Sequence, residues 1–197
     1  MKIRALALVA AILIVTPGVT IAEDRQKLGG AAQAEDEAAR RYFTDAELVD
    51  QNGTPRRFYS DLIRGRKVLI NFAFTACKGV CPTMTANLAK VQKLLGKRVG
   101  TEVTILTITV DPVNDTPAAL KRYAEQFKAG PGWLFLSGAP ENVNAVLKKL
   151  GGLAPRPEEH SSVLLVGDAA TGYWVKTAAV DQPESIVALI DHINDRR

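Results

Sequence analysis

The 197-residue sequence is poor in residues that mark several protein classes, with two cysteines, two histidines and 6% aromatic residues. Two cysteines exclude a disulfide-stapled scaffold, and a chain of this length can bury a hydrophobic core without staples. A structural zinc site would need four ligands, and recruiting His192 from the end of the chain as the fourth is implausible. Lysine and arginine form only isolated pairs, so we expect no nucleic-acid partner.

The longest N-terminal apolar run is also too short for a membrane span, which needs roughly 20 residues. Residues 1–22 instead combine Lys2 and Arg4 with an apolar stretch and a small-residue end at Ala22, as a secretory signal peptide does. Its removal would lower the formal net charge from +4 to +2. We predict a periplasmic protein exported across the inner membrane, or one that contacts the membrane through an uncleaved N-terminal anchor.

Residues 23–41 are rich in alanine, glutamate, glutamine and arginine and have no apolar stripe, so we predict a linker with local helix. One domain follows, residues 42–197. A hairpin is indicated by two short strands around Asn52-Gly53. The later pattern predicts strands at residues 68–74, 103–110, 133–136, 162–166 and 173–177, and helices at residues 82–95, 115–127, 140–150 and 183–193. Leu88, Val91, Leu94 and Leu95 are expected on the apolar face of the first helix. This order predicts an α/β, thioredoxin-like fold, a central mixed sheet flanked by helices with an N-terminal β-hairpin.

Both cysteines, Cys77 and Cys81, lie where the first buried strand passes into a helix that opens with Pro82. A helix N-terminus favours thiolate over thiol, the form that attacks disulfides or binds soft metals. The Cys-x-x-x-Cys spacing places the two Cβ atoms about 5–6 Å apart on a regular helix, whereas a disulfide needs about 3.5–4.5 Å, so the spacing suits a metal better than a disulfide bond. Because Pro82 and Gly79 favour a turn there, both chemistries stay open.

The remaining soft donors are Met84, His160 and His192. Met84 falls on the same helical side as Cys81 and could offer a thioether to a metal, but we expect it to be a core residue. His192 is expected on a solvated helix face, beside Asp191. His160 follows a proline-containing loop after Gly152.

The chain resembles the Sco/SenC family of thioredoxin-like copper proteins, which assist assembly of the copper centre of cytochrome c oxidase. The resemblance rests on Asp50-Gln51-Asn52-Gly53, the run from Asn71 to Met84 with both cysteines, Thr109-Val110-Asp111-Pro112-Val113-Asn114-Asp115-Thr116-Pro117, and His160-Ser161. The segment before His160 departs from the family, because Pro157-Glu158-Glu159 stands where an Asp or Val is usual.

The resemblance implies that Cys77, Cys81 and His160 bind one copper ion, with Asp111 in a supporting role. It implies that the protein binds Cu(I), can also hold Cu(II), and delivers copper to the copper-bearing subunit of a cytochrome c oxidase. Other copper chaperones or thiol reductants are the further partners that it implies. The alternative is a thiol-disulfide oxidoreductase, in which Cys77 and Cys81 reduce the cysteines of a partner. His160 separates the two functions, because a metal site needs it and a disulfide exchanger does not.

Overall fold

The structure is a computed structural model that describes residues 20–194, so the predicted signal peptide lies almost wholly outside the described residues. The chain divides into two units, residues 1–38 and residues 39–197. Helix α1 (Thr20–Phe43) covers the expected linker, whose role as a linker stays a prediction. Among the described residues, no helix combines the length and apolar character that a membrane span requires.

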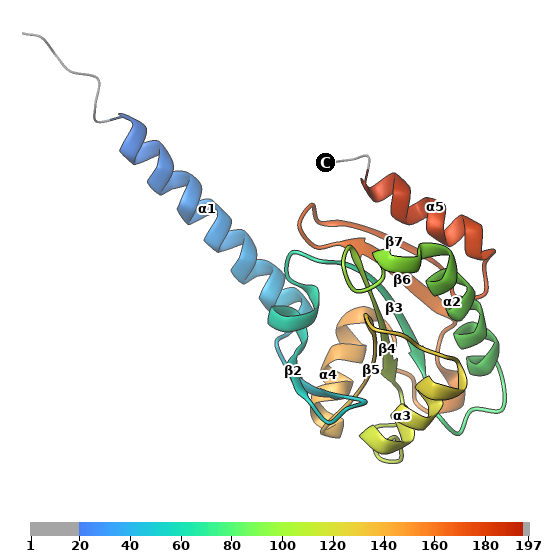
Figure 1. The fold of residues 1–197 in the computed structure, drawn as a ribbon. Coiled ribbons are helices and arrows are strands. Elements are labelled where there is room, and N and C mark those ends of the chain that lie inside the picture. Colours follow the sequence, from blue (N-terminus) through green and yellow to red (C-terminus); the bar gives the residue numbers. More distant parts are fainter. Residues whose placement is uncertain (1–19, 195–197) are drawn as a thin grey trace, which may run out of the picture. The chain divides into compact units, whose positions relative to one another are not determined.

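A seven-stranded mixed sheet, flanked by helices, is the centre of the second unit and agrees with the predicted architecture (Figure 1). Its spatial order is β2-β1-β5-β4-β3-β6-β7. The strands are β1 (Glu47–Asp50), β2 (Pro55–Arg57), β3 (Lys67–Ala73), β4 (Val103–Thr109), β5 (Trp133–Ser137), β6 (Val163–Asp168) and β7 (Tyr173–Ala178).

Four helices follow α1, and each carries the proline that the sequence places in its first turn: α2 (Cys81–Leu95), α3 (Pro117–Gln126), α4 (Pro140–Leu150) and α5 (Pro183–Asn194). Proline is tolerated there because the first amide groups of a helix have no intrahelical partner. The Thr116 side chain caps α3 by accepting a hydrogen bond from the Ala119 amide. Short helical turns lie at η1 (Phe58–Ile63), η2 (Gly96–Arg98) and η3 (Pro157–Glu159).

Strand β3 is buried along its whole length because it lies between two strands and under helices on both sides. It pairs in parallel with β4 and in antiparallel with β6. The end of β3 and the start of β6 therefore meet at one edge of the sheet. Residues that follow β3 and residues that precede β6 come together there.

Two hydrophobic clusters cover the two sides of the sheet. We call the side under α2, α3 and α5 the α2 face; its strand residues include Leu69, Ile105 and Phe135. We call the side under α4 and η1 the α4 face; its strand residues include Ile70 and Phe72. Helices α2 and α5 lie side by side (Figure 1).

The N-terminal hairpin forms as predicted, with Asp50 at its base. One Asp50 carboxylate oxygen accepts hydrogen bonds from the amides of Asn52, at 2.9 Å, and Thr54, at 3.0 Å. Gly53 has a φ of 80°, which only glycine adopts without strain. The turn is therefore specified by local sequence.

The prediction is wrong for one of the four residues expected on the apolar face of α2. Leu88, Val91 and Leu95 are buried, whereas Leu94 is 51% exposed. Leu88, Val91 and Leu95 follow the three- and four-residue spacing of one helix face, and Leu94 lies off that face. The apolar side chain of Leu94 is therefore solvent-facing.

Candidate metal site

The three predicted ligands come from three separate segments at one edge of the sheet. Cys77 closes a turn after β3, in which its amide donates to the Phe74 carbonyl at 3.3 Å. Cys81 is the first residue of α2, and His160 follows η3 shortly before β6. The hydrogen-bonded turn thus precedes Cys77, whereas the residues between the cysteines form a bend outside the helix, which begins at the second cysteine.

The ligand atoms of Cys77, Cys81 and His160 all lie within 4.8 Å of one another. His160 Nε2 lies 3.0 Å from Cys81 Sγ. Within the described residues, this is the one group of three or more cysteine, histidine or acidic side chains with metal-site spacing. The structure therefore brings together the three residues expected to bind a metal, two of them 79 positions apart.

Access to the three side chains is uneven. Cys81 and His160 are buried, whereas Cys77 is half-buried. A pocket of about 320 Å³ opens beside them, with Phe74, Cys77, Val80, Glu158 and His160 among its lining residues. A second molecule would therefore reach the site at Cys77.

The hydrogen bond of Nδ1 determines which ring nitrogen of His160 carries the proton. Nδ1 lies 3.1 Å from the Ser161 carbonyl oxygen, which can only accept, so Nδ1 carries the proton. Nε2 then presents its lone pair to the neighbouring thiols. Burial lowers the pKa of His160, although the contact with the Ser161 carbonyl acts the other way. A neutral imidazole with a free Nε2 is the form that binds a metal.

The expected lowering of the thiol pKa at the helix N-terminus is not found for Cys81. Burial, with a further contribution from the neighbouring Cys77 thiol, raises the pKa of Cys81 to about 12. Desolvation disfavours the thiolate more than the helix dipole favours it. Without a metal, Cys81 is therefore a neutral thiol, and a soft cation would supply the charge that a thiolate needs.

Asp111, expected to support the site, is not part of the three-residue group. Its carboxylate accepts two contacts from the Asn114 side-chain amide, at 3.0 and 2.9 Å, within the loop that follows β4. A supporting role for Asp111 stays a prediction.

Another carboxylate of the same loop contacts the turn of Cys77, and the sequence argument missed it. Asp115 is 1% exposed and accepts hydrogen bonds from the amide and the hydroxyl of Thr75. Its position in the sequence predicts only the start of a helix. The one available signal was its place in the Asp-Thr-Pro motif.

The other soft donors lie where the sequence placed them. Met84 is fully buried in the hydrophobic cluster of the α2 face. His192 is exposed on α5, with its ring 6.5 Å from that of Tyr173. Neither belongs to the group of metal-spaced ligands.

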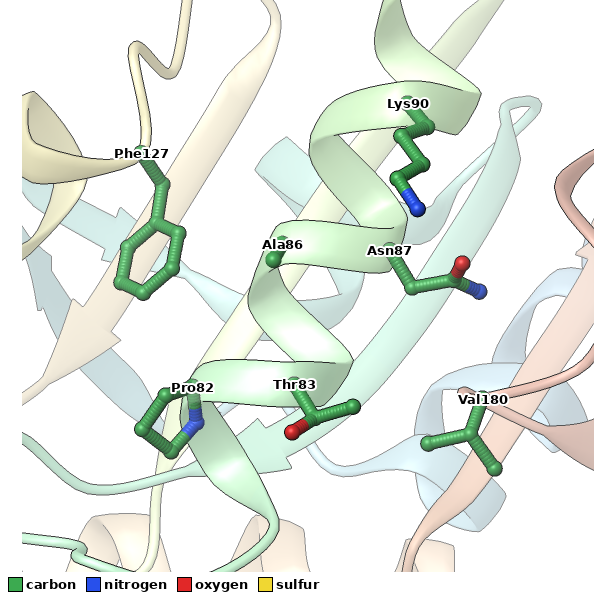
Figure 2. Close-up of a pocket in the computed structure, with 7 residues that line it drawn as sticks. All are labelled: Pro82, Thr83, Ala86, Asn87, Lys90, Phe127 and Val180. Atoms are coloured by element: carbon green, nitrogen blue, oxygen red, sulfur yellow. The ribbon is translucent and has the colours of Figure 1, made fainter.

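A second pocket, of about 460 Å³, runs along the exposed side of α2 and begins directly after Cys81, at Pro82. Figure 2 shows α2 passing between Phe127 and Val180. The Asn87 side chain holds the loop that carries Val180, because it donates to the Ala179 and Asp181 carbonyls. This pocket is lined by one charged side chain, Lys90, and by no thiol, imidazole or carboxylate. It offers contact surface next to the thiols but no ligand chemistry of its own.

Comparison with known proteins finds relatives over most of the chain. A family model described as SCO1/SenC matches residues 33–194. The SCO2-like protein of Rickettsia conorii is 35% identical over 131 residues, which cover 66% of this chain and 55% of the relative. The SCO1 protein homolog of Bacillus subtilis is 32% identical over 117 residues, 58% of this chain and 60% of the relative. The chain thus spans little more than half the length of these curated relatives.

Solved structures share the fold. The structure of Bradyrhizobium japonicum ScoI with copper bound has a TM-score of 0.63 and 29% identity, over 75% of this chain and 96% of that chain. A SCO1/SenC family lipoprotein from Bacillus anthracis has a TM-score of 0.64 and 25% identity, over 75% and 92%. These similarities confirm the predicted thioredoxin-like Sco fold.

Proposed function

The chain belongs to the SCO1/SenC family, and on that premise we propose that it binds one copper ion and delivers it to the copper centre of a cytochrome c oxidase. One observation carries the proposal: two thiols and an unprotonated imidazole nitrogen converge within 4.8 Å. The copper bound in the related ScoI structure supports the choice of metal.

The donor set fits copper as cargo. Two sulfurs and one imidazole suit Cu(I), can also hold Cu(II), and bind copper more strongly than the other divalent first-row metals. Three protein ligands leave a coordination position free for a partner. The half-buried Cys77 is the ligand that a thiolate of the recipient can reach first. Ligand exchange at Cys77 would then pass the ion on while Cys81 and His160 keep their places.

The partner and the compartment belong to the same proposal. The recipient is the copper-bearing subunit of the oxidase, and other copper chaperones or thiol reductants would load or reduce the site. Transfer takes place in the periplasm if residues 1–22 direct export. If that segment is retained, it anchors the protein in the membrane.

The second candidate is thiol-disulfide exchange, which the unequal exposure of the cysteines favours. The Cys77 thiolate would attack a partner disulfide, and the buried Cys81 would resolve the mixed disulfide. The products are two partner thiols and a Cys77–Cys81 disulfide, so two electrons pass from the chain to the partner. Copper binding and this disulfide exclude each other because they use the same sulfurs.

An anaerobic copper titration of the reduced protein separates the two candidates. We expect the native chain to retain one copper per chain after desalting and His160→Ala to retain none, because the variant keeps only the two sulfurs. His192→Ala is the matched control, since it removes the exposed histidine of α5 and should keep the metal.

Thiol exchange with a small disulfide should survive in His160→Ala. Absence of retained copper in the native chain, together with fast reduction of the disulfide, would favour the oxidoreductase and contradict the copper proposal.

A further inference from the structure

Of the three ligands, Cys77 is the one that is only half-buried. Cys81 lies in the first turn of α2 and is fully buried. The buried His160 follows η3, where its amide donates to the Pro157 carbonyl, and its ring packs edge-on against Phe74 at 5.9 Å. Cys77 is half-buried and follows a single turn from Phe74. Whatever holds this turn determines where the Cys77 sulfur lies relative to the other two ligands.

Asp115 holds that turn from the loop after β4. Its carboxylate accepts the Thr75 amide at 3.2 Å from both oxygens, and the Thr75 hydroxyl at 2.5 Å. Thr75 lies two residues before Cys77 and inside the turn. Because Asp115 is 1% exposed, these bonds compete little with water.

Asp115 is itself held to the end of β4. Thr109 donates its hydroxyl proton to the second Asp115 oxygen at 2.5 Å, and the Thr109 oxygen accepts the Asp111 amide at 3.0 Å. The Asp115 amide donates to the Asp111 carbonyl at 2.9 Å. A buried carboxylate thus joins the turn of Cys77 to the parallel partner of β3.

We propose that Asp115 is the positioning residue of Cys77, and that it keeps the two cysteines at a spacing suited to a metal rather than to a disulfide. This inference rests on the proposed copper site and adds a determinant of the choice between the two chemistries. Asp115 does not contact the metal itself, since it lies outside the ligand group.

The two chemistries require different sulfur positions. A disulfide needs its sulfurs about 2.05 Å apart, whereas two thiolates on one metal each lie about 2.3 Å from the ion and farther from each other. A turn held in place keeps Cys77 at the distance of the described structure. A loosened turn lets the Cys77 sulfur approach Cys81, which the helix holds still.

The test uses Asp115→Asn, an isosteric change that places an amide NH₂ against the hydroxyl and amide donors. Asp45→Asn is the matched control, because Asp45 holds a turn in the same way: it accepts the Ser60 amide at 2.8 Å and the Ser60 hydroxyl at 2.7 Å. Neither Asp45 nor Ser60 belongs to the metal-spaced group. Thr75→Val is a milder second variant that removes one hydrogen bond to Asp115 and keeps the backbone.

The first readout is Cu(I) affinity, measured by competition with a chromophoric chelator. We expect Asp115→Asn to bind about tenfold more weakly than the native chain, as for other residues that orient metal ligands. Thr75→Val should weaken binding in the same direction but less. Asp45→Asn should bind like the native chain.

The second readout needs no metal. The metal-free protein is equilibrated with glutathione, so that two thiols of the chain and one glutathione disulfide give the Cys77–Cys81 disulfide and two reduced glutathiones. We expect Asp115→Asn to shift this equilibrium toward the chain disulfide by about threefold, and Asp45→Asn to leave it unchanged.

Native-like values of both readouts in Asp115→Asn and Thr75→Val would overturn the inference, and so would a parallel fall in metal binding and disulfide formation. If the native chain binds no copper, the proposed function fails, whereas the glutathione equilibrium still tests whether Asp115 positions Cys77. If Asp115→Asn does not fold, Thr75→Val decides.

Discussion

The two faces of the central sheet differ in what they bury. On the α4 face, the buried side chains of β3 and β4 are all apolar, at Val68, Ile70, Phe72, Leu106 and Ile108. On the α2 face the alternate positions of the same strands include four buried polar residues, Lys67, Asn71, Thr107 and Thr109.

Hydrogen bonds of these polar residues form two separate groups on the α2 face, and one of the groups leads toward the metal site. Thr107 donates to the Asn71 side-chain oxygen at 2.7 Å and accepts from the Trp133 indole at 2.9 Å. Thr109, two residues further along β4, donates to Asp115. One face of the sheet therefore mainly stabilises the fold, while the other also orients the loop that carries Cys77.

The largest expected effect comes from the α4 face. Phe72 is fully buried, and Gly152 packs directly on its ring, because a Cβ at that glycine would lie 2.6 Å from it. Phe72→Ala should lower the free energy of unfolding by about 3–5 kcal/mol, since the cavity cannot refill. Urea unfolding followed by circular dichroism measures the loss. The copper stoichiometry of the folded fraction should be unchanged. A change in it would show that the α4 face also affects the metal site.

A smaller effect is expected from the polar network of the α2 face. Thr107→Val keeps the shape but leaves the Asn71 oxygen and the Trp133 N–H buried without their partner, which should cost about 2–3 kcal/mol. Ile108→Val, the next residue on the opposite face, should cost about 0.5–1.5 kcal/mol. Urea unfolding of the pair compares them directly. Equal losses would show that the hydrogen bonds of Thr107 add nothing to its packing.

The smallest expected effect concerns Asp45, beside η1 on the α4 side. Burial acts to raise the pKa of Asp45, but hydrogen bonds from Ser60 and Arg40 and the charge of Arg40 outweigh it, so the pKa lies below its ordinary value. The unfolded state therefore takes up this proton first as the pH falls. The stabilisation is complete above the unfolded pKa of about 3.9 and is lost as the pH falls through the lower folded pKa.

The difference in unfolding free energy between the native chain and Asp45→Asn should therefore shrink between pH 6 and pH 3. Urea titrations at several pH values measure it. A difference that stays constant with pH would mean that Asp45 acts through packing alone.

Much of the fold was predictable because local residues specify it. The apolar run predicted β3, and α4 has the predicted bounds because Pro140 opens it and Gly151, with a φ of 75°, ends it. Leu94 was misplaced because a run of apolar residues does not reveal which of them lies at the edge of the helix face. The short helical segment η1, Phe58–Ile63, gave no periodic signal of its own, although Phe58, Tyr59, Leu62 and Ile63 enter the core.

The site was predictable where the type of a residue alone indicates its chemistry, as for cysteine and histidine. Cys77, Cys81 and His160 were named from a motif, and the structure brings them together. Asp115 was missed because its role depends on Thr75, 40 positions earlier, and on the parallel register of β3 and β4. Neither can be read from neighbouring residues. The high pKa of Cys81 likewise follows from burial, which a helix-terminus argument does not contain.

The antiparallel pairing of β3 with β6 also has a consequence for how the protein is made. During synthesis both cysteines emerge long before His160, which lies 79 residues after Cys81. Pairings between distant segments form late, because closing a long loop precedes any gain from the contact. A half-made chain therefore exposes two thiols without their histidine, and the complete ligand set exists only after β6 has joined the sheet. Retention of copper by the three ligands would thus report that folding has finished.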